Sequence, residues 1–434
     1  MYFDRIKTFF RKLNYKSYIF FYILMNTIMP LVAVLTSKVL TTYTFMVVVL
    51  VSVLFTFFAC RLLNIREYIV LLVPFILYEM LDMFVMNNED FLLAGYQVLL
   101  FMLPICLGYY LINKGDVQYG IFSVVLTSIF VITAITTIIG CMRYPDAARV
   151  LATTKTSQDS TAIFYGLNNI GGYGFVYSFV LLYPAVILAF KMKKLNIFIT
   201  IGFVILAFTL AITAEYTYAL LLLLITSLLF FVRLNISVSR FIFLLILFFV
   251  GALVFKSLIG NILLKIGNMI GNDTMTAKMT VVFLGEEVVG NVDDSRDALY
   301  MFSINKFLEN PLLGTFVKGY KVTGGHSFIL DNLSLYGLLG GTLMFLMYGG
   351  IFKVFYKPYL DLPGRGIVFW LFLQPIVLSS VNTGMWQWNL CLYAPLILYA
   401  LYGSEPYTKK LNAPKPLVNI TRLNSKSRSK EAPE

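Results

Sequence analysis

Long apolar runs recur along most of the chain and are separated by short polar segments. A helix needs about 20 mostly apolar residues to cross the hydrocarbon core of a bilayer, and twelve runs approach or reach that length. The pattern therefore predicts an all-α, polytopic integral membrane protein with about 12 transmembrane helices. The expected spans are 17–36, 43–63, 68–86, 91–112, 118–141, 173–190, 196–213, 216–232, 240–262, 327–356, 366–384 and 387–403.

The composition excludes a soluble domain and limits the chemistry. Hydrophobic residues make up 59% of the 434 residues and charged residues only 13%, with a mean hydropathy of +0.81, whereas soluble domains carry about 25% charged residues. One histidine and four scattered cysteines cannot supply a His/Cys metal centre, so we expect neither a metal nor a cofactor. In a membrane protein, a net charge of +12 reflects the basic residues that set the orientation of the chain in the bilayer. No nucleic-acid partner is expected.

The basic residues favour a cytoplasmic N-terminus, because Lys and Arg concentrate in cytoplasmic loops. With that orientation, the even-numbered loops and both termini hold most of the 34 Lys and Arg residues, while the short outer loops hold almost none. We therefore expect both termini to be cytoplasmic. Residues 1–403 would form a single transmembrane domain, followed by a basic tail, 404–434, for which we expect disorder.

Two outer loops are much longer than a connection requires: residues 142–172 and residues 263–326. Long loops in compact proteins are usually functional, and both of these fall on the outer face in the expected topology. The chain also lacks a glycine-rich phosphate loop of the GxxxxGK[ST] type. Cytosolic nucleotide sugars and ATP are therefore not expected as substrates.

The only histidine, His326, ends the longer loop in Gly324-Gly325-His326-Ser327, directly before the tenth expected span. Counting outward from the cytoplasmic Lys353 puts it about 10 Å beyond the hydrocarbon, at headgroup depth. A neutral imidazole there could accept a proton from a sugar hydroxyl, and the adjacent helix start would favour an anion such as a diphosphate. Alternatively, His326 only caps or packs against the loop.

Arginines in both loops are candidates for binding a diphosphate, because guanidinium binds two phosphate oxygens at once and stays charged. Arg296 is the first choice, although Asp294 and Asp297 beside it could simply pair with it. Arg143 and Arg149 in the shorter loop could close on the same anion or rest in the lipid headgroups. The acidic residues of the longer loop lack a DxD arrangement, and no metal site is expected among them: Glu286, Glu287, Asp293, Asp294 and Asp297.

Several carboxylates could belong to an acceptor site or cavity. Glu79 and Asp82 are three residues apart on one face of the third expected span, and Glu215 also falls in the outer half of a span. Charge at that depth usually faces a polar cavity or a partner, and pairing that only stabilises the helix bundle is the alternative. Asp331 lies about 140° around the helix from His326, so it is a cavity candidate but not an obvious orienting partner.

Glycines in the tenth span, Gly337-Leu338-Leu339-Gly340-Gly341, are typical of a close-packing helix surface. Together with the preceding segment they carry a resemblance to a family. The stretch from Ser295 through Asn310-Pro311-Leu312-Leu313-Gly314 and His326-Ser327 to Gly340 resembles the Wzy-type polysaccharide polymerases of the O-antigen ligase and polymerase superfamily. In that family an Arg-containing outer segment leads to an Asn-Pro-x-x-Gly turn, then to a His before a span bearing Gly-Leu-x-Gly.

The resemblance implies a GT-C-like fold and a metal-independent, inverting glycosyltransferase at the outer face of the bacterial cytoplasmic membrane. Its substrates would be undecaprenyl-diphosphate-linked oligosaccharides, and a chain-length regulator and a flippase would be partners besides the membrane lipids. His326 would deprotonate or position the acceptor hydroxyl. Arg296, with Arg143 or Arg149, would stabilise the negative charge that develops on the departing diphosphate.

Two other functions remain open. A ligase of the same superfamily would pass finished glycan to a different acceptor; Ser327, where many ligase-like members have Asn, and the lone Arg296, where some have paired arginines, favour a polymerase weakly. A lipid-linked glycan flippase or other transporter would need a charged central cavity and often internal repeats. The chain shows no convincing similarity between its halves.

Overall fold

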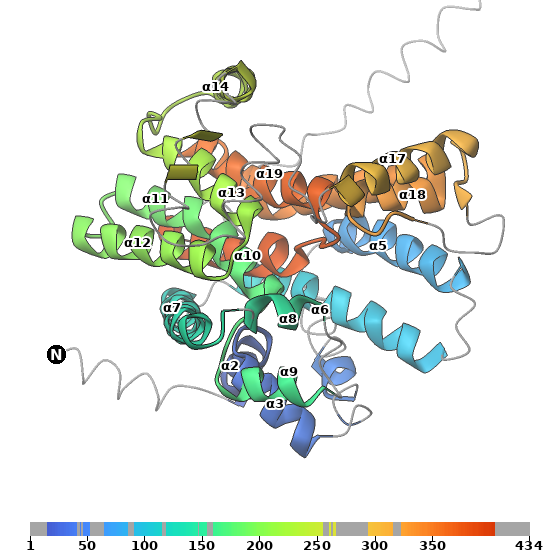
Figure 1. Ribbon diagram of the computed structural model, residues 1–434, viewed down its shortest axis with the longest axis horizontal. Helices are drawn as coiled ribbons and strands as arrows, with labels where there is room; N and C mark the ends of the chain where they lie inside the picture. Colours follow the sequence, from blue (N-terminus) through green and yellow to red (C-terminus); the bar gives the residue numbers. More distant parts are fainter. Residues whose placement is uncertain are drawn as a thin grey trace, which may run out of the picture.

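The computed structural model describes residues 15–40, 44, 47–52, 65–85, 91–114, 119–145, 147–153, 159–254, 260–261, 264–265, 294–315 and 323–403 (Figure 1). Throughout these ranges every regular element is a helix, which confirms the all-α class. The helices are α2 Tyr15–Ile28, α3 Pro30–Val39, α5 Ile65–Val85, α6 Phe91–Lys114, α7 Tyr119–Arg143, α8 Ala147–Thr153, α9 Ser160–Leu167, α10 Tyr173–Leu181, α11 Tyr183–Lys191, α12 Ile197–Thr213, α13 Thr217–Ser227, η1 Leu228–Phe230, α14 Val238–Val254, α17 Asp294–Glu309, α18 Phe328–Ile351, η4 Phe352–Tyr356, η5 Lys357–Tyr359, α19 Arg365–Val381, η6 Asn389–Tyr393 and α20 Ala394–Tyr402.

Three helices of the described chain are long and apolar enough to cross a membrane: Phe122–Arg143, Tyr173–Lys191 and Phe328–Tyr359. A fourth is obtained if α2 and α3 count as one bent span. Membrane association follows from these helices. Other helices, most of them shorter, occupy the positions of most other expected spans. The second span, 43–63, and the tail 404–434 lie largely or wholly outside the described residues.

The first expected span, 17–36, is not a continuous helix. α2 and α3 meet at an angle of 111° on either side of Met29. Pro30 occupies the first position of α3, where its missing N–H costs nothing. Met29 is extended, with φ −98° and ψ 109°, as steric contact with a following proline favours. The expectation of one helix over 17–36 was therefore wrong, and the chain turns sharply at this point.

The core lies around α10 and α11, where Val176, Phe179, Ile187 and Leu188 are fully buried. In Figure 1, α7 is viewed along its axis, while α12 and α18 run across the view. α7 packs against both α12 and α20, so the helices cross one another around the core.

Both of the expected outer loops contain helices. α17 lies within 263–326 and packs along α18 at the right of Figure 1. The shorter loop, 142–172, contains α8 and α9, of which α9 packs against α3 and α8 against α10. Residues 266–293 and 316–322 lie outside the described residues.

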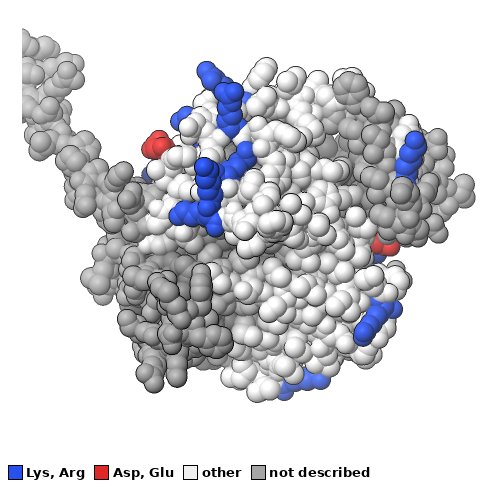
Figure 2. Space-filling model, turned by 90° about the vertical axis from the view of Figure 1, so that its left-hand side faces the viewer, with Lys and Arg blue, Asp and Glu red and all other residues white. Residues whose placement is uncertain are grey.

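Basic side chains at the end of α11 and at the start of α19 donate to backbone carbonyls of the segment that follows α13. Lys191 Nζ donates to the carbonyl of Val232 at 2.7 Å, and Arg365 Nε donates to the carbonyl of Ile236 at 3.0 Å. The end of α11 and the start of α19 therefore meet at the segment that follows α13. These segments are among those expected to be cytoplasmic. Figure 2 shows several Lys and Arg side chains close together in the upper left of the view and others apart from them at the right and lower edges.

Candidate functional site

The turn Asn310–Gly314 docks into an interruption of α18. Gly337 has φ 58° and ψ −151°, which is not helical, so the following N–H groups lose their partners within the helix. Leu338 N–H donates instead to the carbonyl of Pro311 at 2.8 Å, and Leu339 N–H donates to the carbonyl of Leu312 at 3.1 Å. The turn thus satisfies backbone donors that would otherwise be unpaired. The prediction of a close-packing helix surface at 337–341 is confirmed for the close approach of backbone at Gly337, but Gly337 itself is not helical.

Glycine is required on both sides of this contact. A Cβ on Gly314 would lie 2.3 Å from the carbonyl carbon of Leu335, and a Cβ on Gly337 would lie 2.5 Å from the carbonyl carbon of Leu312. Both glycines also have positive φ, 72° and 58°, which L side chains rarely adopt. The Asn-Pro-x-x-Gly and Gly-Leu-x-Gly sequences are therefore two sides of one backbone contact.

Asp331 fixes the histidine loop, residues 324–327. Its Oδ1 accepts hydrogen bonds from Ser303 Oγ at 2.7 Å and from Gly325 N–H at 3.2 Å, and its Oδ2 accepts from Ser327 N–H at 3.2 Å. The side chain is buried, with 9% of the residue exposed. Asp331 therefore holds the backbone on either side of His326, although their spacing along the helix did not indicate a contact.

His326 itself is half-buried, between the exposed Gly325 and the buried Ser327. Ser327 is the N-cap of α18, and its Oγ accepts a hydrogen bond from Leu330 N–H at 3.1 Å. The imidazole thus stands at the start of a helix, where unpaired N–H groups and the helix dipole favour an anion. A half-exposed imidazole in a fixed loop can accept a proton from a hydroxyl brought to it.

The segment after α19 lies against the histidine loop. Phe328 N–H donates to the carbonyl of Asn382 at 2.9 Å, and the hydroxyl of Tyr300 in α17 donates to the carbonyl of Val381 at 3.1 Å. The same segment leads, four residues after Asn382, to Trp386. Residues 381–386 therefore connect the histidine loop with a second group of side chains.

The second group contains an ion pair between two sequence candidates. Arg149 Nη1 in α8 lies 3.3 Å from Glu215 Oε2, and the side chains are 40% and 13% exposed, respectively. Glu215 stands between α12 and α13 with φ 59°, a conformation that costs free energy for a non-glycine residue. The hydroxyl of Tyr216 donates to the carbonyl of Ala148 at 2.7 Å and so holds α8 to this turn.

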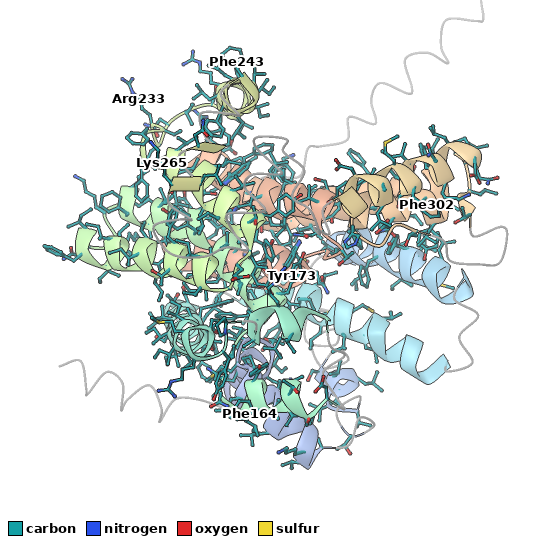
Figure 3. The ribbon with its side chains drawn as sticks, in the orientation of Figure 1. Phe164, Tyr173, Arg233, Phe243, Lys265 and Phe302 are labelled. Carbon is teal, nitrogen blue, oxygen red and sulfur yellow. The ribbon has the colours of Figure 1, made fainter. Side chains whose placement is uncertain are left out.

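Four aromatic rings, Tyr173, Tyr177, Tyr216 and Trp386, pack beside this ion pair and are called the aromatic cluster below. Ring centroids are 4.7 Å apart for Tyr173 and Tyr177, and 5.5 Å apart for Tyr177 and Trp386. Tyr216 lies 5.5 Å from both tyrosines. In Figure 3, Tyr173 lies near the middle of the molecule, at the start of α10.

Trp386 differs from the other members of the aromatic cluster in its backbone conformation and in its buried donor. It has φ 57° and is 8% exposed, and its Nε1 is buried without a hydrogen-bond partner within the described part of the chain. Aromatic side chains with a few polar groups are typical of ligand sites, and backbone strain gathers at such sites. No motif or charge pattern in the sequence indicates any of these four rings.

The other candidate residues make no described contact with the histidine loop or with the Arg149–Glu215 pair and the aromatic cluster. Arg143 is exposed at the end of α7. Arg296 belongs to α17, and Glu79 and Asp82 belong to α5, but their side chains lie outside the described residues. In the described ranges, no group of three or more His, Cys, Asp or Glu residues could hold a metal ion.

No protein-family model matches this sequence, and no curated protein matches it either.

Proposed function

We propose that the protein polymerises surface polysaccharide, such as O-antigen or capsule, in the bacterial cytoplasmic membrane. Its substrates are oligosaccharide repeat units linked to undecaprenyl diphosphate, which it joins at the outer face. In this proposal the chain has twelve spans in a GT-C-like arrangement, with both termini in the cytoplasm. A flippase and a chain-length regulator are its proposed partners.

The observation that supports this proposal most is that Asp331 holds the backbone on both sides of His326. The same carboxylate binds Ser303 of α17, and the turn that follows α17 docks at Gly337 of α18. The parts of the sequence that carry the family resemblance therefore form one structural unit around the histidine. A base or a positioning residue requires such a fixed backbone.

The proposed reaction transfers the growing glycan to the next repeat unit. The acceptor hydroxyl gives its proton to His326, and its oxygen attacks the anomeric carbon of the first sugar of the donor chain. The bond from that carbon to the diphosphate oxygen breaks on the opposite face, which inverts the configuration. Undecaprenyl diphosphate leaves with the bonding electrons, and Arg296, with Arg143 or Arg149, stabilises its charge.

The Arg149–Glu215 ion pair helps to decide which arginine of the shorter loop binds the diphosphate. Arg149 already has Glu215 as its counter-charge, so it has less charge to offer a diphosphate than the exposed Arg143 has. We therefore propose Arg143 as the second diphosphate ligand. Arg149, Glu215 and the aromatic cluster then suit a sugar, because sugars combine apolar ring faces with hydroxyls that hydrogen-bond to charged groups.

The test is electrophoresis of lipid-linked and mature surface glycan from cells that lack the gene and carry wild type, His326→Ala or Arg296→Ala. We expect wild type to restore a ladder and both variants to accumulate single repeat units. Lys306→Gln is the control on α17, because the ammonium of Lys306 contacts the exposed Glu309 and the ring of Phe302, neither of which belongs to the histidine loop; it should restore the ladder.

Other outcomes would favour the other functions. Long polymer that remains on the lipid in the deletion strain would indicate a ligase. Repeat units that stay on the inner face would indicate a flippase. A normal ladder in the deletion strain would exclude both enzymatic functions.

A further inference from the structure

α14 diverges from the body of the protein and leaves an open groove. The groove has a volume of about 1050 Å³ and lies between α14 and the end of α13 with its following loop. Its walls are mainly apolar, with two arginines among them. The lining residues used below are Leu228, Leu229, Arg233, Arg240, Leu244 and Gly251.

Among the described residues, α14 packs most closely near its start, and the groove opens beyond that point. Phe241 is 1% exposed and packs at Gly366 of α19, where an added Cβ would lie 3.2 Å from its ring. Further along, Leu244 and Leu247 are 42% and 56% exposed although they line the groove. An added Cβ at Gly251 would meet no atom within 4 Å. The groove is therefore open towards the end of α14.

The two arginines of the groove are available for an anion. Arg233 and Arg240 are exposed, and no ion pair with either is found in the described ranges. Neighbouring basic residues differ, because Lys191 and Arg365 donate to backbone carbonyls of the same loop. In Figure 3, Arg233 lies at the edge of the molecule, and Phe243 lies on the outer side of α14.

We propose that this groove binds an anionic phospholipid of the adjacent leaflet. An acyl chain lies along Leu228, Leu229 and Leu244, and the headgroup phosphate lies between the guanidinium groups of Arg233 and Arg240. Two arginines beside an apolar groove match a ligand that joins an anion to hydrocarbon, and basic pockets between membrane helices bind such headgroups. The proposal does not depend on the proposed polymerase activity.

The first test is titration of the purified full-length protein with phosphatidylglycerol or phosphatidylcholine, with bound lipid counted by native mass spectrometry. Wild type should bind phosphatidylglycerol more tightly, and Arg233→Gln/Arg240→Gln should weaken that binding about 10- to 30-fold. Lys353→Gln/Lys357→Gln removes the same charge from exposed residues that do not line the groove, and it should bind as wild type does.

A second pair of variants tests the apolar part without changing charge. Gly251→Phe fills the groove, because a side chain there enters open space. Gly202→Phe, on α12, also meets open space but lies outside the groove. We expect only Gly251→Phe to lose bound phosphatidylglycerol.

Five results would overturn the proposal, four of which concern binding at the groove itself. Two concern charge: wild type binds phosphatidylglycerol and phosphatidylcholine equally, or the arginine and lysine variants lose equal affinity for phosphatidylglycerol. The other two are wild-type affinity for phosphatidylglycerol in Gly251→Phe and displacement of the lipid by millimolar inorganic phosphate. Tighter binding of undecaprenyl phosphate than of phosphatidylglycerol would overturn the assignment to a phospholipid.

Discussion

The hydroxyl of Ser303 donates a 2.7 Å hydrogen bond to the carboxylate of Asp331 and thereby ties α17 to the first turn of α18. The same carboxylate also accepts hydrogen bonds from the backbone on both sides of His326. One buried negative charge thus joins a helix, a loop and a helix start. Removing that charge should affect the loop before it affects the rest of the fold.

Asp331→Asn should loosen the histidine loop. The amide keeps one acceptor oxygen, but its NH2 group faces backbone donors that it cannot satisfy, so we expect a loss of about 1–3 kcal/mol in the free energy of unfolding. Hydrogen exchange at residues 324–327 should rise more than exchange in α10. Thermal unfolding in detergent gives the global loss.

Ser303→Ala is the matched control for Asp331→Asn. It removes the hydroxyl that donates to Asp331 and accepts from Gly324 N–H at 2.9 Å, but it leaves the charge of Asp331. We therefore expect a smaller loss, of about 1 kcal/mol. The double variant should lose less than the two single losses combined, because both act on one network. Additive losses, or unchanged exchange at 324–327 in Asp331→Asn, would contradict this account.

Gly314→Ala and Gly337→Ala should each destabilise the protein by about 2–4 kcal/mol. Each methyl group would meet backbone at 2.3–2.5 Å, and each residue would keep a positive φ. Fluorescence-detected size exclusion after heating measures the loss. We expect both variants to unfold at clearly lower temperatures than wild type.

Gly349→Ala is the control for the two glycine variants. Gly349 lies on the same helix, α18, and an added Cβ there meets no atom within 4 Å. Alanine favours a helix over glycine by about 0.5–1 kcal/mol, so this variant should unfold at the same or a higher temperature. If all three glycine variants behave alike, the docking of the turn at Gly337 is wrong.

Apolar runs predicted helix positions well, because a helix in a bilayer must hide its backbone over its whole length. The expected span 118–141 corresponds to Tyr119–Arg143, and 327–356 corresponds to Phe328–Tyr359. The break at Pro30 could not be read in the same way. Pro74, Pro104 and Pro375 remain inside their helices, so proline alone does not predict where a helix ends.

The candidate site was harder to predict from the sequence than the helices were, because its residues come from distant segments of the chain. His326 and Glu215 were selected for their chemistry and burial cost, which a single sequence does reveal. The Arg149–Glu215 contact and the position of Trp386 depend on which helices meet, and apolar periodicity says nothing about that. The helical angle between Asp331 and His326 does not indicate a pairing, because the partners of Asp331 are backbone groups that precede the helix and the hydroxyl of Ser303 on α17.

Glu215→Gly should give a more stable protein than Glu215→Ala. Both variants remove the carboxylate that pairs with Arg149, but only glycine adopts φ 59° without steric cost. We expect a difference of about 1–2 kcal/mol in the free energy of unfolding. Chemical denaturation of both purified variants measures it, and a more stable alanine variant would show that the backbone at residue 215 is not left-handed.

Trp386→Phe separates packing from hydrogen bonding in the aromatic cluster. Phenylalanine keeps an aromatic ring beside Tyr173 and Tyr177 but removes the Nε1–H group, which is buried without a described partner. Since an unsatisfied buried donor costs free energy, the loss of packing should be partly offset, and we expect a stability change of about 1 kcal/mol or less.

If the Trp386 donor binds a sugar hydroxyl during the proposed reaction, KM for the lipid-linked acceptor should rise several-fold in Trp386→Phe. Trp388→Phe, a substitution of the same kind outside the aromatic cluster, should leave KM unchanged. An equal rise in both variants would contradict a role for the Trp386 donor.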